Sequence, residues 1–132
     1  MRAQWRRAAV PEAVPELRAA VTAFASGAGV LDPPMADVRL AVTEAVTNVV
    51  LHGYRDVPEP GMVEIVATHS ADELRVSVLD RGQGAAPRSD SPGLGQGLAL
   101  MAKISDRFEL RDRVPVGTEV RMTFALASPP GA

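Results

Sequence analysis

The most informative segment of the chain is EAVTNVVLHG, residues 44–53. Its polar residues Glu44, Asn48 and His52 recur at every fourth position, so they share one face of a helix. A carboxylate and a carboxamide one helical turn apart suit magnesium-dependent chemistry on phosphates, because Asn offers Mg²⁺ a neutral oxygen and Glu can accept a proton. A solvated polar face is the alternative interpretation of this segment taken alone.

The residues around this segment define the helix that carries it. Its apolar stripe consists of Val38, Val42, Ala45 and Val49. These spacings predict a helix from about Met35 to Leu51, with Asp32 as N-cap and Gly53 as stop signal. Upstream, residues 15–26 predict another helix, and residues 1–10 could hold a short first strand.

The second informative segment is DRGQG, residues 80–84, which follows an alternating, strand-like run at residues 74–79. Residues 62–69 alternate as well, so the two runs predict a β-hairpin. Asp80 would lie at the rim of the sheet, where a buried carboxylate needs a hydrogen-bond donor. The exocyclic amine of adenine is such a donor, and Gly82 and Gly84 would let the backbone approach a flat ring. An ordinary Asp-Gly turn is the alternative.

The third informative segment is GLGQGL, residues 93–98, which opens a short helix predicted for residues 98–104. Glycines at a helix N-terminus expose backbone N–H groups at the positive end of the helix dipole, which suits a phosphate. No βαβ unit surrounds the segment, so it does not match a Rossmann fingerprint. It also lacks the Gly-Lys-Ser/Thr sequence of a P-loop.

The order of the predicted elements indicates the fold class. A last hairpin, residues 108–111 and 118–126, completes the order strand, two helices, two strands, helix, two strands. Because the strands come in hairpins, we expect a mostly antiparallel sheet with helices on one face, which is a two-layer α/β sandwich of the α+β class. Residues 1–127 are expected to form a single domain and residues 128–132 a flexible tail.

Composition excludes several classes of function. The chain has 132 residues, a formal net charge of −2, no cysteine and two histidines. Disulfides, thiolate nucleophiles and cysteine-ligated zinc are therefore excluded, and a histidine-rich metal site is not expected. Basic residues are scattered rather than striped, so we expect no direct binding to nucleic acid. No signal peptide or membrane-spanning run is evident, so we expect a cytoplasmic protein without membrane contact.

Together and in this order, the three segments resemble the GHKL (HATPase_c) ATP-binding superfamily. Residues 44–54 look like the N-box of the bacterial anti-sigma-factor serine/threonine kinases, and residues 95–101 are similar to their second glycine box. The resemblance covers roughly residues 37–124. It implies the Bergerat ATP-binding fold, with ATP and Mg²⁺ as ligands.

The resemblance also implies a role for each matching residue. Asn48 would ligate Mg²⁺, and Glu44 would be the catalytic general base. Asp80 would read adenine, and Thr118 would support the adenine end. The full nucleotide-binding set would be Asn48, Asp80, Gly82, Gly84, Gly93, Gly95, Gln96, Gly97, Leu98 and Thr118. His52 would have a supporting rather than a catalytic role.

The function implied by the resemblance is that of an anti-sigma-factor regulator and protein serine/threonine kinase. It would sequester a sigma factor and transfer the ATP γ-phosphate to an anti-sigma-factor antagonist, and a homodimer is plausible because family members commonly pair. The alternative is a regulator that binds its partner with ATP but does not phosphorylate it. A detached histidine-kinase domain is disfavoured by the short lid expected at residues 85–92, where Arg88 either reaches a phosphate or is solvated. A purely structural domain would require three motifs to coincide by accident.

Overall fold

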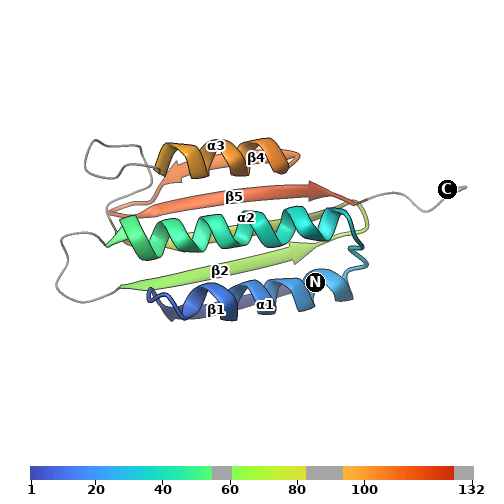
Figure 1. The fold of residues 1–132 in the computed structure, drawn as a ribbon, viewed down its shortest axis with the longest axis horizontal. Helices are drawn as coiled ribbons and strands as arrows, with labels where there is room; N and C mark the ends of the chain where they lie inside the picture. Colours follow the sequence, from blue (N-terminus) through green and yellow to red (C-terminus); the bar gives the residue numbers. More distant parts are fainter. Residues whose placement is uncertain (55–60, 83–93, 127–132) are drawn as a thin grey trace, which may run out of the picture.

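The protein folds into a five-stranded sheet with helices on one face (Figure 1). The computed structural model describes residues 1–54, 61–82 and 94–126. The elements are β1 (Arg2–Ala8), α1 (Ala13–Gly27), α2 (Pro34–Asn48), the π-helical turn η1 (Val49–Gly53), β2 (Met62–His69), β3 (Glu73–Asp80), α3 (Leu94–Ile104), β4 (Arg107–Asp112) and β5 (Thr118–Ala125). The predicted two-layer α/β sandwich is confirmed.

The strands follow the order β1-β2-β3-β5-β4, and all four neighbouring pairs are antiparallel. Both predicted hairpins, β2–β3 and β4–β5, are present. In the central pair β3–β5, Asp80 stands opposite Thr118, and on its other side Asp80 stands opposite Val63 of β2. The register therefore sets the acid and the threonine side by side at one end of the sheet.

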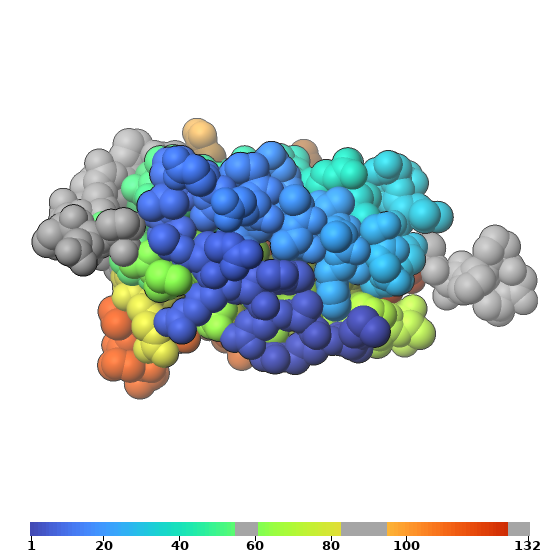
Figure 2. Space-filling model, turned by 90° about the horizontal axis from the view of Figure 1, so that it is seen from below, coloured from blue at the N-terminus to red at the C-terminus, as the bar shows by residue number. Residues whose placement is uncertain are grey.

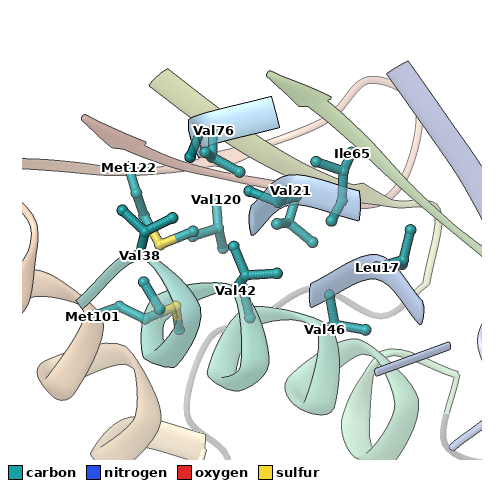
Figure 3. Close-up of a cluster of buried hydrophobic side chains, with 14 of the residues drawn as sticks. Leu17, Val21, Val38, Val42, Val46, Ile65, Val76, Met101, Val120 and Met122 are labelled. Carbon is teal, nitrogen blue, oxygen red and sulfur yellow. The ribbon is translucent and has the colours of Figure 1, made fainter. Parts of the chain in front are cut away.

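The hydrophobic core lies between the sheet and α2, which is flanked by α1 and α3 (Figure 1). Figure 3 shows Val38, Val42 and Val46 of α2 directed toward strand residues such as Ile65 and Met122. The predicted apolar stripe of this helix is buried along its whole length. The burial of apolar side chains from both the helix and the strands holds α2 in position over the sheet.

The other face of the sheet is lined by charged side chains that pair with one another. Glu73 forms ion pairs with Arg75 and Arg107, and Glu119 forms one with Arg121 at 2.9 Å. At the β1 edge, β1 and α1 lie on the same side of the molecule (Figure 2). One face of the sheet is thus apolar and covered, and the other is polar and open.

Helix boundaries differ from prediction at several points, and the predicted end at Leu51 lies in η1, because α2 ends at Asn48. α1 begins at Ala13, two residues before the predicted start. Asp32 does not cap α2: Pro33 occupies the N-cap position and Pro34 has no N–H, while the next two N–H groups, of Met35 and Ala36, donate to the Leu31 and Pro33 carbonyl oxygens. α3 begins at Leu94, so Gly95 and Gly97, expected in a turn before the helix, lie inside its first turns. Packing of α3 against α2 outweighs the low helix propensity of glycine.

Candidate functional site

The first cluster of the candidate site lies where α3 meets the polar face of α2. A Cβ atom placed on Gly97 would lie 3.1 Å from Asn48 Nδ2, 3.2 Å from Asn48 Oδ1 and 3.3 Å from Glu44 Oε2. The backbone of α3 therefore touches both polar side chains of the predicted stripe. Only a residue without a side chain allows this approach at no displacement of its neighbours. We call Glu44, Asn48 and Gly97 the phosphate end.

The side-chain nitrogen of Asn48, Nδ2, is buried without a hydrogen-bond partner among the described residues. A buried amide without a partner is unfavourable by several kcal/mol in an apolar medium, so such groups normally bind protein, water or ligand. Asn48 is also the last residue of α2, immediately before the π-helical turn η1. Such turns within helices are frequent at functional sites.

The second cluster lies at the end of β3. Asp80 is only 6% exposed, and its Oδ1 accepts a hydrogen bond of 2.8 Å from the backbone N–H of Gly82. Burial raises the pKa of Asp80 from its ordinary value of 3.8, while the Gly82 N–H and the positive charge of Arg113 act in the opposite direction. An acid held in this way is well suited to accept a hydrogen bond from a ligand.

Thr118 completes the second cluster. It is 1% exposed, faces the helical layer, and stands opposite Asp80 in the β3–β5 register. Its Oγ1 is buried and makes no hydrogen bond to any residue that the structure describes. A carboxylate and an unsatisfied hydroxyl therefore lie next to each other under the helices. We call Asp80, Gly82 and Thr118 the base end.

The two ends are joined by η1. Gly53, the last residue of η1, lies so close to Gly82 that a Cβ on Gly82 would be 1.7 Å from the Gly53 carbonyl oxygen. A Cβ on Gly53 would be 3.9 Å from Asp80 Cγ. Asn48 and Gly53 belong to one continuous helical segment, so this segment meets α3 at Asn48 and the end of β3 at Gly53. The site extends from the α2–α3 contact to the β3–β5 end.

The remaining predicted residues are distributed unequally. Gly95 and Gln96 lie in the first turn of α3, next to the phosphate end. Leu98 is 8% exposed and belongs to the hydrophobic core, so its side chain serves packing. Gly84, Gly93 and the predicted lid at residues 85–92 lie outside the described residues.

Two residues of the site were not predicted from sequence. Tyr54 Oη accepts a hydrogen bond from the Arg81 N–H, and Arg113 Nη1 donates to the Asp80 carbonyl oxygen. Tyr54 ends the segment that resembles the N-box, but no periodicity assigned it a partner. Arg113 lies between two predicted strands and carries no sequence signal.

Within residues 1–54, 61–82 and 94–126, no three His, Cys, Asp or Glu residues cluster so as to hold a metal ion. In the same ranges, no helix combines the length and apolar character needed to cross a membrane.

Comparisons with known proteins identify the family of the chain. The model of the histidine kinase-like ATPase domain family matches residues 8–124. An anti-sigma F factor of Thermoanaerobacter sp. (strain X514) is 33% identical over 125 residues, covering 84% of each chain. An anti-sigma F factor of Clostridium acetobutylicum is 34% identical over 125 residues, covering 83% of this chain and 84% of its own.

A solved structure is similar as well. The structure of the RsbU and RsbW domains of Rv1364c from Mycobacterium tuberculosis matches 98% of this chain with a TM-score of 0.77 and 25% identity. The chain spans 33% of the length of that solved chain. The fold is therefore the predicted ATP-binding fold of the GHKL type. The chain belongs to the histidine kinase-like ATPase domain family and, within it, to the anti-sigma-factor branch.

Proposed function

We propose that the protein binds ATP along η1 and transfers its γ-phosphate to a serine or threonine of an anti-sigma-factor antagonist. Like the relatives named anti-sigma F factor, it would also bind a sigma factor. The observation that carries the proposal is the contact of Gly97 with both Glu44 and Asn48. The helical segment that carries these two residues ends at Gly53, which lies beside Asp80. It brings a candidate base and a candidate metal ligand to one end of a site whose other end suits adenine.

At the base end, the Asp80 carboxylate would accept a hydrogen bond from the exocyclic amine of adenine. Thr118 Oγ1, which has no hydrogen bond within the described ranges, would complete the polar contacts there. Gly53 and Gly82 pack backbone against backbone, so no side chain of theirs fills the space beside the carboxylate. Hydrogen bonds to a charged acceptor are among the stronger ones, so this end would supply much of the specificity.

At the phosphate end, the residues present fit a magnesium nucleotide. The Asn48 carboxamide offers one oxygen, and the phosphates and water would provide the remaining ligands, as is usual for Mg²⁺. A bound Mg²⁺ neutralises negative charge on the phosphate oxygens during transfer. The first turn of α3 would present backbone N–H groups to the same phosphates.

Glu44 would act on the incoming hydroxyl. The serine or threonine oxygen attacks the γ-phosphorus, the bond to the β–γ bridging oxygen breaks, and ADP leaves with the electron pair of that bond. The hydroxyl proton passes to the Glu44 carboxylate. Positioning of this kind suffices for phosphoryl transfer, and no covalent enzyme intermediate is required.

The decisive experiment is incubation with γ-labelled ATP and a candidate antagonist domain. We expect label on the antagonist, and Glu44→Ala should reduce its rate by about 10²–10⁴-fold, as expected for loss of a general base, while ATP still binds. Asn48→Ala should instead weaken Mg-ATP binding. Glu16→Ala, which removes an exposed carboxylate of α1, is the matched control and should leave transfer unchanged.

Three outcomes would change the proposal. Normal transfer by Glu44→Ala would show that the assigned base is wrong. ATP binding by the wild-type protein together with capture of the partner but no transfer would support the alternative, a non-catalytic ATP-dependent regulator. Failure of Mg-ATP to bind in a calorimetric titration would refute both.

A further inference from the structure

One peptide group of the site is held at both of its polar atoms. It is the group between Asp80 and Arg81, directly beyond the end of β3. Its carbonyl oxygen accepts a hydrogen bond of 2.9 Å from Arg113 Nη1, and its N–H donates a hydrogen bond of 3.0 Å to Tyr54 Oη. The two side chains come from different segments, one after η1 and one from the β4–β5 turn.

The Tyr54 hydroxyl is itself tightly held. It donates to the Met62 carbonyl oxygen at 2.6 Å, so it bridges the first residue of β2 and the residue after β3. Its ring lies against the backbone of Gly61, where an added Cβ would fall 2.1 Å from two ring carbons. The approach depends on a glycine at that position. The hydroxyl therefore stands at a fixed point at the end of the β2–β3 pair.

Arg113 approaches the same peptide group from the β4–β5 side. Its own N–H donates to the Gly117 carbonyl oxygen at 2.9 Å, which closes the turn. Gly117 has a φ of +112° and lies so near that a Cβ there would be 2.1 Å from the Asp80 carbonyl oxygen. The turn is thus built tightly against Asp80, and the guanidinium reaches its carbonyl from the turn.

A cavity of about 230 Å³ borders both residues on the open face of the sheet, with Arg6, Met62 and Leu79 also in its lining. Water can enter this space. Removal of the Tyr54 hydroxyl would leave the Arg81 N–H able to bind water, so the loss would affect orientation more than folding.

We propose that Tyr54 and Arg113 are positioning residues for base recognition: together they orient the Asp80–Arg81 peptide group and thereby the Asp80 carboxylate. The inference rests on the proposed function, since it assumes that Asp80 reads the base. In this role neither side chain needs to touch the nucleotide. Both act through Asp80, whose carboxylate is further held by the Gly82 N–H.

The test compares two nucleotides by calorimetric titration in the presence of Mg²⁺. ATP carries the exocyclic amine, and inosine triphosphate carries an oxygen in its place. A well-oriented carboxylate prefers ATP, so the ratio of the two dissociation constants reports orientation. We expect Tyr54→Phe and Arg113→Gln each to reduce this ratio by about fivefold, as for loss of one ordinary hydrogen bond. Simple destabilisation would lower the fraction of competent protein and leave the ratio unchanged.

Matched controls remove the same chemical groups elsewhere. Thr22→Val removes a hydroxyl that bonds within α1, and Arg107→Gln neutralises an arginine of β4 that pairs with Glu73. Both should keep the wild-type ratio. Amide hydrogen exchange in the free protein gives an independent measurement: Tyr54→Phe should accelerate exchange at Arg81 and leave Val78, within the β3 ladder, unchanged.

The outcomes separate the two levels of the proposal. If the wild-type protein binds no nucleotide, the proposed function fails. If it binds ATP and both variants keep the wild-type ratio, or if it does not prefer ATP at all, the positioning inference is wrong. Unchanged exchange at Arg81 in Tyr54→Phe would also overturn the inference, independently of nucleotide.

Discussion

The base end and the phosphate end of the site are built in different ways. The base end is part of the sheet: Asp80 and Thr118 are opposite each other in the β3–β5 ladder and are almost fully buried. The phosphate end is a contact between two helices, in which Gly97 of α3 meets the side chains of Glu44 and Asn48.

This difference predicts different responses to perturbation. At the base end, the close contacts are between backbone atoms, such as Gly82 with the Gly53 carbonyl oxygen, and these have little freedom to move. At the phosphate end, the atoms nearest Gly97 belong to side chains, which can shift by a few tenths of an ångström. An added methyl group should therefore lower the free energy of unfolding strongly at the base end and only slightly at the phosphate end.

The largest effect is expected for Gly82→Ala. The new methyl group would lie 1.7 Å from the Gly53 carbonyl oxygen, so the backbone must move. We expect the free energy of unfolding to fall by about 3 kcal/mol or more, as for severe overpacking, when measured by urea denaturation. Gly27→Ala is the control, since a Cβ there meets nothing within 4 Å. Wild-type stability of Gly82→Ala would contradict the rigid contact.

The second effect concerns Asp80→Asn. Loss of a charged hydrogen-bond acceptor should weaken ATP binding by about 10–100-fold in a titration at neutral pH. The same change should stabilise the free protein, because burial raises the pKa of Asp80 and the folded state therefore binds its proton more tightly than the unfolded chain.

The sign of the pH dependence follows from that raised pKa. Between the unfolded value near 3.8 and the higher folded value, the wild-type protein loses stability as the pH rises, and the loss persists above that window. Asp80→Asn should lack this loss, so its advantage over wild type should grow across the window. Urea denaturation of both proteins from acid to neutral pH provides the measurement. An advantage that is greatest in acid would contradict the assigned cause.

A smaller effect is expected for Gly97→Ala. Its methyl group would lie 3.1–3.3 Å from the side chains of Asn48 and Glu44, which must shift slightly. Mg-ATP affinity should fall by about tenfold, with stability within about 1 kcal/mol of wild type, because alanine favours the helix more than glycine does. A loss of stability as large as that of Gly82→Ala would remove the distinction between the two ends.

The smallest effect is expected for Thr118→Val. The hydroxyl makes no hydrogen bond within the described ranges, so its loss should leave the free energy of unfolding unchanged or slightly raised. ATP affinity should fall by about threefold, as for one weak hydrogen bond to a ligand. Thr22→Val, in α1, is the control for binding. A marked loss of stability in Thr118→Val would mean that the hydroxyl has a structural partner.

Much of this architecture could be predicted from the sequence. Alternation in residues 62–69 and 74–79 correctly predicted a hairpin, because a strand with one buried face must alternate. The four-residue spacing of Glu44 and Asn48 correctly placed them on one helical face, half-buried beside the apolar stripe. The start of α3 was predicted four residues late, because glycines are weak helix formers and only packing against α2 reveals that they are helical.

The roles assigned to Glu44, Asn48, Asp80 and Thr118 remain predictions until the variants are measured. Spacing and residue chemistry, which are local properties, determined the helix face, the hairpins and the acid at the end of a strand. The tertiary structure alone decided that Gly97 meets Asn48, that Gly53 meets Gly82, and that Tyr54 and Arg113 hold one peptide group. These contacts join segments far apart in the chain, and no local sequence pattern predicts which two segments will pack against each other.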